Sequence, residues 1–170
     1  MSIFVTAIYR IYGDERPEYC DEVWSRFAYL AQQFPAIHLF CSHVDAVRAM
    51  AIPTVIPHYI ELMETETYKS LADASGLPEI RNTVKDSKEF MLLINAKPEF
   101  IRRACNAASG AARYIWIDAG IQKILQSNPI GSVQQMIARC QTLPPSYPPT
   151  VLLPGIEWHR KQYGSIADIG

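Results

Sequence analysis

Short apolar runs alternate with segments of helical spacing over the first third of the chain, and this alternation restricts the fold more than any other feature. Runs at 3–9, 37–41 and 54–56 are rich in β-branched and aromatic residues and predict three strands. Apolar residues recur at helical spacing between 23 and 34. This order predicts an α/β fold with a mostly parallel central sheet and helices on both faces.

Prolines and capping residues indicate where these elements begin and end. Pro17 suits the first turn of the helix that follows the first strand. Pro53 and Pro57 bracket the third run and are expected to keep that strand short. Asp86 and Glu89 fit a capping box, in which Asp86 accepts from an exposed N–H and Glu89 reaches back. A long helix is therefore expected to begin at this point.

That helix is expected to bury one stripe of its surface. The stripe consists of Phe90, Leu93, Ile94, Lys97, Ile101 and Ala104. Pro98 lacks an N–H and clashes with the preceding turn, so it should kink or split the helix. Lys97 is the charged residue of the stripe. It either extends its amine to the rim of the core or points at an anionic ligand.

The second half of the chain continues the alternation of strands and helices. Residues 114–117 predict a strand, and 121–125 predict the start of a helix. A turn is expected at 128–131, a further helix at 133–140 and a last short strand at 151–153.

Composition indicates a globular protein with a single domain, 1–170. Hydrophobic residues make up 49% of the chain and charged residues 19%, which is enough apolar surface to offset chain entropy. Lys and Arg number 16 against 17 Asp and Glu, without a dense basic cluster, so nucleic acid is not an expected partner. The sequence shows no transmembrane run, no signal-peptide pattern and no Cys-x-x-Cys pair, so a cytoplasmic protein with reduced thiols is expected.

Asp118 is the leading candidate for a functional residue. It follows the strand at 114–117, and ligands of parallel α/β sheets bind beyond the carboxyl ends of the strands. A carboxylate there can hold a divalent metal or accept hydrogen bonds from a ribose, while Gly120 lets backbone approach a ligand closely. The alternative is that Asp118 caps the helix that follows it.

Two segments resemble the WlaTC/HtrL glycosyltransferase-like family. Residues 90–101 (FMLLINAKPEFI) match an Asn-x-Lys-Pro-x-Phe helix, and residues 114–121 (YIWIDAGI) match a Trp-Ile-Asp-x-Gly strand end. The run at 3–9 is similar to the family's first strand. The resemblance implies a GT-A-type, Rossmann-like fold with a nucleotide-sugar-binding core at 1–125 and a C-terminal part, 126–170, that is not matched.

The resemblance also implies roles for individual residues. Lys97 would face the diphosphate of the nucleotide sugar as a point charge. Asp118, with Gly120 beside it, would be the catalytic residue and would approach the ribose and a divalent metal such as Mn²⁺ or Mg²⁺. The metal would neutralise the leaving diphosphate as a Lewis acid. The nucleotide is expected against three residues near the end of the first strand: Thr6, Ala7 and Tyr9.

The family's motif carries two aspartates two positions apart, and the second of them is Gly120 in this chain. One expected function is therefore transfer of a sugar from a nucleotide-sugar donor to an unknown acceptor. The alternative is a catalytically inactive binding or structural module that retains the fold. A third reading is an α/β enzyme of another class that uses Asp118 as an acid or base.

Overall fold

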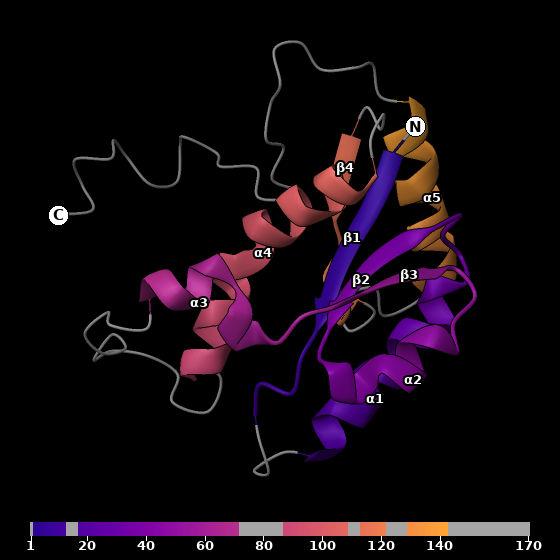
Figure 1. Ribbon diagram of the computed structural model, residues 1–170. Coiled ribbons are helices and arrows are strands. Elements are labelled where there is room, and N and C mark those ends of the chain that lie inside the picture. The colour runs from indigo at the N-terminus through magenta and orange to yellow at the C-terminus, as the bar shows by residue number, and fades with distance from the viewer. Residues whose placement is uncertain (1, 13–16, 72–86, 109–112, 122–128, 143–170) are drawn as a thin grey trace, which may run out of the picture.

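The computed structural model describes residues 2–12, 17–71, 87–108, 113–121 and 129–142. Within these residues, four strands form one sheet in which every pair of neighbours is parallel (Figure 1). The strands, in their order across the sheet, are β3 (Val55–Tyr59), β2 (Ile37–Cys41), β1 (Ser2–Ile8) and β4 (Arg113–Trp116). The expected α/β fold with a parallel sheet is confirmed, and it is Rossmann-like.

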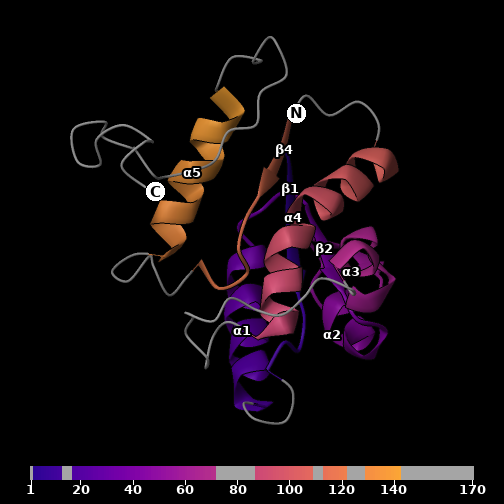
Figure 2. The same cartoon turned by 90° about the vertical axis from the view of Figure 1, so that its left-hand side faces the viewer.

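Helices connect the strands. The α-helices are α1 (Pro17–Ala31), α2 (Ala46–Met50), α3 (Glu66–Leu71), α4 (Lys88–Ala107) and α5 (Pro129–Thr142), and two short 3-10 helices are η2 (His43–Asp45) and η3 (Leu62–Glu64). Figure 2 shows α4 and α5 on opposite sides of the strands. Among the described residues, no helix is both long and apolar enough to cross a bilayer.

The two faces of the sheet bury separate apolar cores. Phe4 and Ile8 of β1 pack with α1 and α5, whereas Val5 and Ala7 pack beneath α4. Successive side chains of a strand point to opposite faces, so the doubly apolar β1 supplies both cores at once. This is why β1 and β2 are nearly inaccessible to solvent along their length.

The strand order places a topological switch point between β1 and β4. From β1 the chain adds β2 and then β3 on one side, and it returns through α4 to add β4 on the other side of β1. In open parallel sheets, such a reversal leaves a crevice at the carboxyl ends of the two strands where the order changes. Here those ends lie at Ile8 and Trp116.

Two expectations about proline were wrong. Pro57 lies inside β3 and does not end it, and β3 continues to Tyr59. β3 is an edge strand of the described sheet, and alternate N–H groups along it face β2. The Ile60 N–H is one that does, donating to the Cys41 carbonyl, so the nitrogen of Pro57 faces the open side and the proline removes no ladder bond to β2. Pro129 does not lie in a turn but begins α5, and Gly131 is also helical. The first position of a helix tolerates proline because its N–H has no intrahelical partner there.

The start of α4 also differs from the expected capping box. Ser87 is the N-cap, and its side chain accepts a hydrogen bond from the Phe90 N–H at 3.1 Å. Asp86 lies outside the described residues. The helix continues through Pro98 without a break, and Figure 2 shows its axis changing direction along its length.

The buried stripe of α4 agrees only in part with the expected one: Ala104 is buried, and Phe90, Leu93 and Ile101 are partly buried against the core, but the centre of the stripe is displaced. Ile94, expected in the core, is 38% exposed. The residues that are buried are Leu92, Ala96, Glu99, Phe100 and Ala104. The strand expected at 151–153 and the helix start expected at 121–125, apart from Ile121, lie outside the described residues.

Candidate functional site

The end of β4 presents Asp118 at the switch point. The Ile117 N–H donates to the carbonyl of Val5 at 2.9 Å, which continues the pairing with β1 by one residue beyond the strand. Ile117 and Ala119 are both buried, so they anchor the chain on either side of Asp118. The Asp118 side chain, between them, is 61% exposed. The sheet thus projects one carboxylate outward from the carboxyl edge.

Lys97 of α4 meets this carboxylate directly. Its Nζ lies 2.8 Å from Oδ1 of Asp118, and its side chain is 30% exposed. The structure therefore brings together the two residues expected to face a nucleotide sugar. One expectation for Lys97 was that its amine extends to the rim of the core, and the structure places it there. The ammonium group is also partly exposed, so an anionic ligand can reach it.

Trp116 contacts both Asp118 and Lys97, and it was not predicted from the sequence as a site residue. Its indole Nε1–H donates to Oδ1 of Asp118 at 2.7 Å, and its ring lies beneath Lys97, with Nζ 5.4 Å from the ring centroid. The ring in turn stacks on Phe100 of α4, with 6.2 Å between centroids. The signal was present, because residues two apart at a strand end project to the same face.

The side chain of Asp118 does not cap the residues that directly follow it. The Ile121 N–H donates to the backbone carbonyl of Asp118 at 3.0 Å, whereas Oδ1 receives Lys97 and Trp116. A Cβ built on Gly120 would meet nothing within 4 Å. The space beside Gly120 is therefore free of other described atoms. No close contact in the described residues requires a glycine at this position.

The three residues expected to receive the nucleotide lie in the core: Thr6 and Ala7 belong to β1, and Tyr9 directly follows it. Thr6 is completely buried, and its hydroxyl has no hydrogen-bond partner among the described residues. Ala7 packs in the core beneath α4. Tyr9 stacks on Phe100 and donates its hydroxyl to the Ile60 carbonyl at 2.9 Å, and burial raises the pKa of this phenol. These side chains support the end of β1 from inside the core. At the corner formed by the carboxyl ends of β1 and β4, Lys97 and Asp118 are the residues in the described part of the chain whose charged groups form the exposed contact.

A second cation lies just beyond β1. Arg10 is half-exposed, and its guanidinium reaches Asp45, which is completely buried, at 3.4 Å. Arg48 of α2 approaches the same carboxylate at 4.0 Å and also pairs with Asp21 of α1. The carboxyl ends of β1 and β2 are thus joined by charged contacts on the side of the sheet away from α4.

The described residues do not form a resident metal centre. No group of three or more His, Cys, Asp or Glu side chains in the described ranges is arranged to hold a metal ion. At the corner itself Asp118 contributes one carboxylate, and the ammonium of Lys97 already neutralises it. A bare divalent ion would have to displace that lysine.

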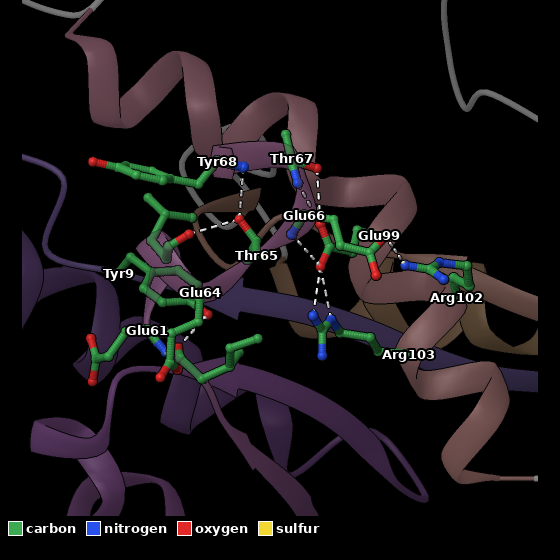
Figure 3. A network of polar contacts seen from close by, with 12 residues as sticks. Tyr9, Glu61, Glu64, Thr65, Glu66, Thr67, Tyr68, Glu99, Arg102 and Arg103 are labelled. Atoms are coloured by element: carbon green, nitrogen blue, oxygen red, sulfur yellow. Dashed lines mark hydrogen bonds and ion pairs between the residues drawn. The ribbon is translucent and has the colours of Figure 1, made fainter. Parts of the chain in front are cut away.

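A larger polar network lies between α3 and α4, and Figure 3 shows it around Glu99. Glu99 accepts hydrogen bonds from the N–H groups of Glu66 and Thr67 at 3.0 and 2.9 Å, and from the Thr67 hydroxyl at 3.0 Å. Arg103 adds an ion pair at 2.8 Å. Burial by itself raises the pKa of Glu99, but these bonds outweigh it and lower that pKa to about 2. Both oxygens are occupied, so the network fastens α3 to α4 and offers no reactive group.

Two histidines form a close pair on the β2–β3 side of the sheet. Nδ1 of His38 and Nε2 of His58 lie 2.8 Å apart, and the His58 ring stacks on Phe40. Burial lowers the pKa of both imidazoles, and the proximity of His38 helps to bring that of His58 to about 4. At neutral pH one neutral imidazole therefore donates to the other.

No protein-family model, curated protein or solved structure was found to match the chain.

Proposed function

We propose that the chain is a glycosyltransferase-like protein that binds a nucleotide sugar at the carboxyl edge between β1 and β4 and transfers the sugar to an acceptor. One observation carries the proposal: an exposed carboxylate and an accessible lysine converge at the switch point of a Rossmann-like sheet. Sheets of this kind bind ligands at that place for geometric reasons, because two loops diverge there.

Each residue has a role in the proposal. Lys97 binds the diphosphate and stabilises the negative charge that develops when it leaves the sugar. Asp118 accepts hydrogen bonds from hydroxyl groups of the nucleotide sugar. Arg10, half-exposed beyond β1, adds positive charge at the same edge. A divalent ion such as Mn²⁺ or Mg²⁺ enters with the diphosphate, because such ions are held by one or two carboxylates together with phosphate oxygens.

The ion pair is compatible with ligand exchange. Exposed pairs contribute about 0–1 kcal/mol, since both charges are well solvated when apart. A diphosphate can therefore draw Lys97 away from Asp118 at small cost.

The proposal includes a cytoplasmic location, which agrees with all four cysteines being outside disulfides.

The test is ligand-induced stabilisation. The melting temperature is measured with UDP, GDP, CDP and ADP, each with and without Mn²⁺. A diphosphate at about 100 times its Kd should stabilise the protein by roughly 2.7 kcal/mol, or about 5–10 °C for a chain of this size. Lys97→Ala and Asp118→Ala should reduce the shift.

Arg102→Ala is the matched control. Arg102 is an exposed cation on the same helix, but it pairs with Glu66 and not with Asp118. Its loss should leave the ligand-induced shift unchanged. No shift with any of the four diphosphates would contradict the proposal and favour the inactive module, for which the satisfied Lys97–Asp118 contact is a structural tie between α4 and β4.

A further inference from the structure

Trp116 and Lys97 both donate a hydrogen bond to Oδ1 of Asp118, but the indole of Trp116 is held in place by packing whereas the side chain of Lys97 is flexible. The indole is built into the sheet, since Trp116 is the last residue of β4 and pairs with Val5 of β1. Its ring lies against Phe100, a completely buried residue. An indole N–H is a donor only, and a stacked ring cannot rotate away without losing that packing.

Lys97 is attached by a flexible chain, so its contact with Asp118 can break while the tryptophan stays in place. The ammonium group sits 5.4 Å from the Trp116 centroid, within the range of a cation–π contact, and 2.8 Å from Oδ1. If the lysine moves to a phosphate, Oδ1 keeps its 2.7 Å bond from Nε1. The carboxylate therefore keeps its orientation through the exchange.

We propose that Trp116 is a positioning residue that fixes Asp118 for ligand binding, an inference that rests on the proposed function for its ligand. The indole acts through Asp118 and does not itself touch the nucleotide sugar. Two consequences follow. Removing the N–H while keeping a ring should weaken ligand binding, and the loss should vanish when Asp118 is already absent.

The hydrogen bond itself is tested without any ligand. The protein has three tryptophans, so ¹⁵N-indole labelling gives three N–H resonances, and Trp116→Phe identifies its own by deletion. Asp118→Ala should move the Trp116 resonance. Trp24 supplies an internal reference, because its Nε1 is buried and has no partner among the described residues. Its resonance should stay in place, and Arg102→Ala should move neither. An unmoved Trp116 resonance in Asp118→Ala would overturn the inference.

The positioning role is tested by binding of UDP with Mn²⁺, or of whichever of the four diphosphates gives the largest shift. Trp116→Phe and Asp118→Ala should each weaken binding about tenfold, the size expected for a lost charge-assisted hydrogen bond. The combined variant should bind no more weakly than Asp118→Ala alone, because residues acting through one contact are not additive. A Trp116→Phe protein that binds like wild type, or additive losses, would refute the role.

The outcomes separate this inference from the proposed function. If wild type binds none of the diphosphates, the proposed function fails, and the indole resonance alone still decides whether Trp116 holds Asp118. If wild type binds and the resonance does not respond to Asp118→Ala, the nucleotide site stands and the positioning role falls. The melting temperature of Trp116→Phe should stay close to that of wild type, since phenylalanine keeps a ring against Phe100.

Discussion

Acid should destabilise this protein through the pair of histidines between β2 and β3, well before its carboxylates titrate. His38 Nδ1 and His58 Nε2 are 2.8 Å apart, a contact that needs one neutral acceptor nitrogen. Burial first, and the nearby His38 second, lower the pKa of His58 from 6.5 to about 4. The perturbation is a change of pH from 7 to 5, made on wild type and on His58→Gln.

The sign follows from proton binding in the two states. Between the folded pKa of about 4 and the unfolded value of 6.5, the unfolded chain binds more protons at His58. The free energy of unfolding therefore falls as the pH drops through this window and is unaffected by His58 above it. A pKa lowered from 6.5 to about 4 corresponds to about 3 kcal/mol in full, of which about 2 kcal/mol is lost by pH 5.

The pH range also isolates histidine from the carboxylates. The pKa of Glu61 and that of Glu99 are lowered, the latter from 4.5 to about 2, so the stability they contribute is lost only as the pH falls below about 4.5. Urea unfolding at pH 7, 6 and 5 measures the free energy of unfolding. Wild type should lose about 2 kcal/mol more than His58→Gln between pH 7 and 5.

His43→Gln serves as the matched control, because His43 is exposed and lies outside the pair. The loss of stability between pH 7 and 5 that His58→Gln removes should persist in this variant. Equal pH dependence in wild type and His58→Gln would refute the reasoning, since it would mean that the buried imidazole accepts its proton as readily in the folded as in the unfolded protein.

Two further predictions concern the polar contacts of α4. Glu99→Gln should lower the free energy of unfolding by about 2–3 kcal/mol, because it weakens charge-assisted bonds to the start of α3, whereas Glu89→Gln at the exposed first turn should change it little. Urea unfolding at pH 7 measures both, and equal losses would contradict the anchoring role of Glu99. Lys97→Met should change the same quantity by less than about 1 kcal/mol, as expected for an exposed pair. A larger loss would indicate that this lysine supports the fold itself.

The strands were predictable because their signal is local. β2 was predicted with its observed bounds, since a strand buried on both faces is mostly apolar along its length, here with His38 as the polar residue. The length of β3 was not predictable from Pro57, because the effect of a proline depends on whether the strand has one neighbour or two. That depends on the order of strands in the sheet, which no local window of the sequence contains.

The displaced stripe of α4 has a similar explanation. The expectation gave weight to large apolar side chains, whereas the face that meets the sheet has alanine on both sides of Phe100, at Ala96 and Ala104. Small residues let the helix approach closely, so that one phenylalanine ring reaches Tyr9 and Trp116 together. Hydrophobicity alone does not distinguish this face from its neighbour one residue away.

The candidate site was predicted in part. The convergence of Lys97 and Asp118 agrees with the arrangement that the family resemblance implied. Nucleotide contacts were expected from Thr6 and Tyr9 because these residues lie near the end of the first strand. Their burial was not predictable, because it depends on which helices cover each face of the sheet. The network of Glu99 was not foreseen either, because a glutamate within a helical segment gives no local sign that another helix will begin against it.

The construction of the corner at Asp118 explains why its parts should respond differently to a ligand. The base of the corner is the Trp116 ring of β4. It stacks on Phe100 of α4, and Phe100 in turn stacks on Phe40 of β2 and on Tyr9, which directly follows β1. The cation above it is held by an exposed pair of low energy. A ligand that competes for Lys97 therefore meets an Asp118 carboxylate whose orientation is set by the core through Trp116. A mutation that disrupts the packing of that core should change the orientation of Asp118 more than the position of the flexible Lys97 side chain.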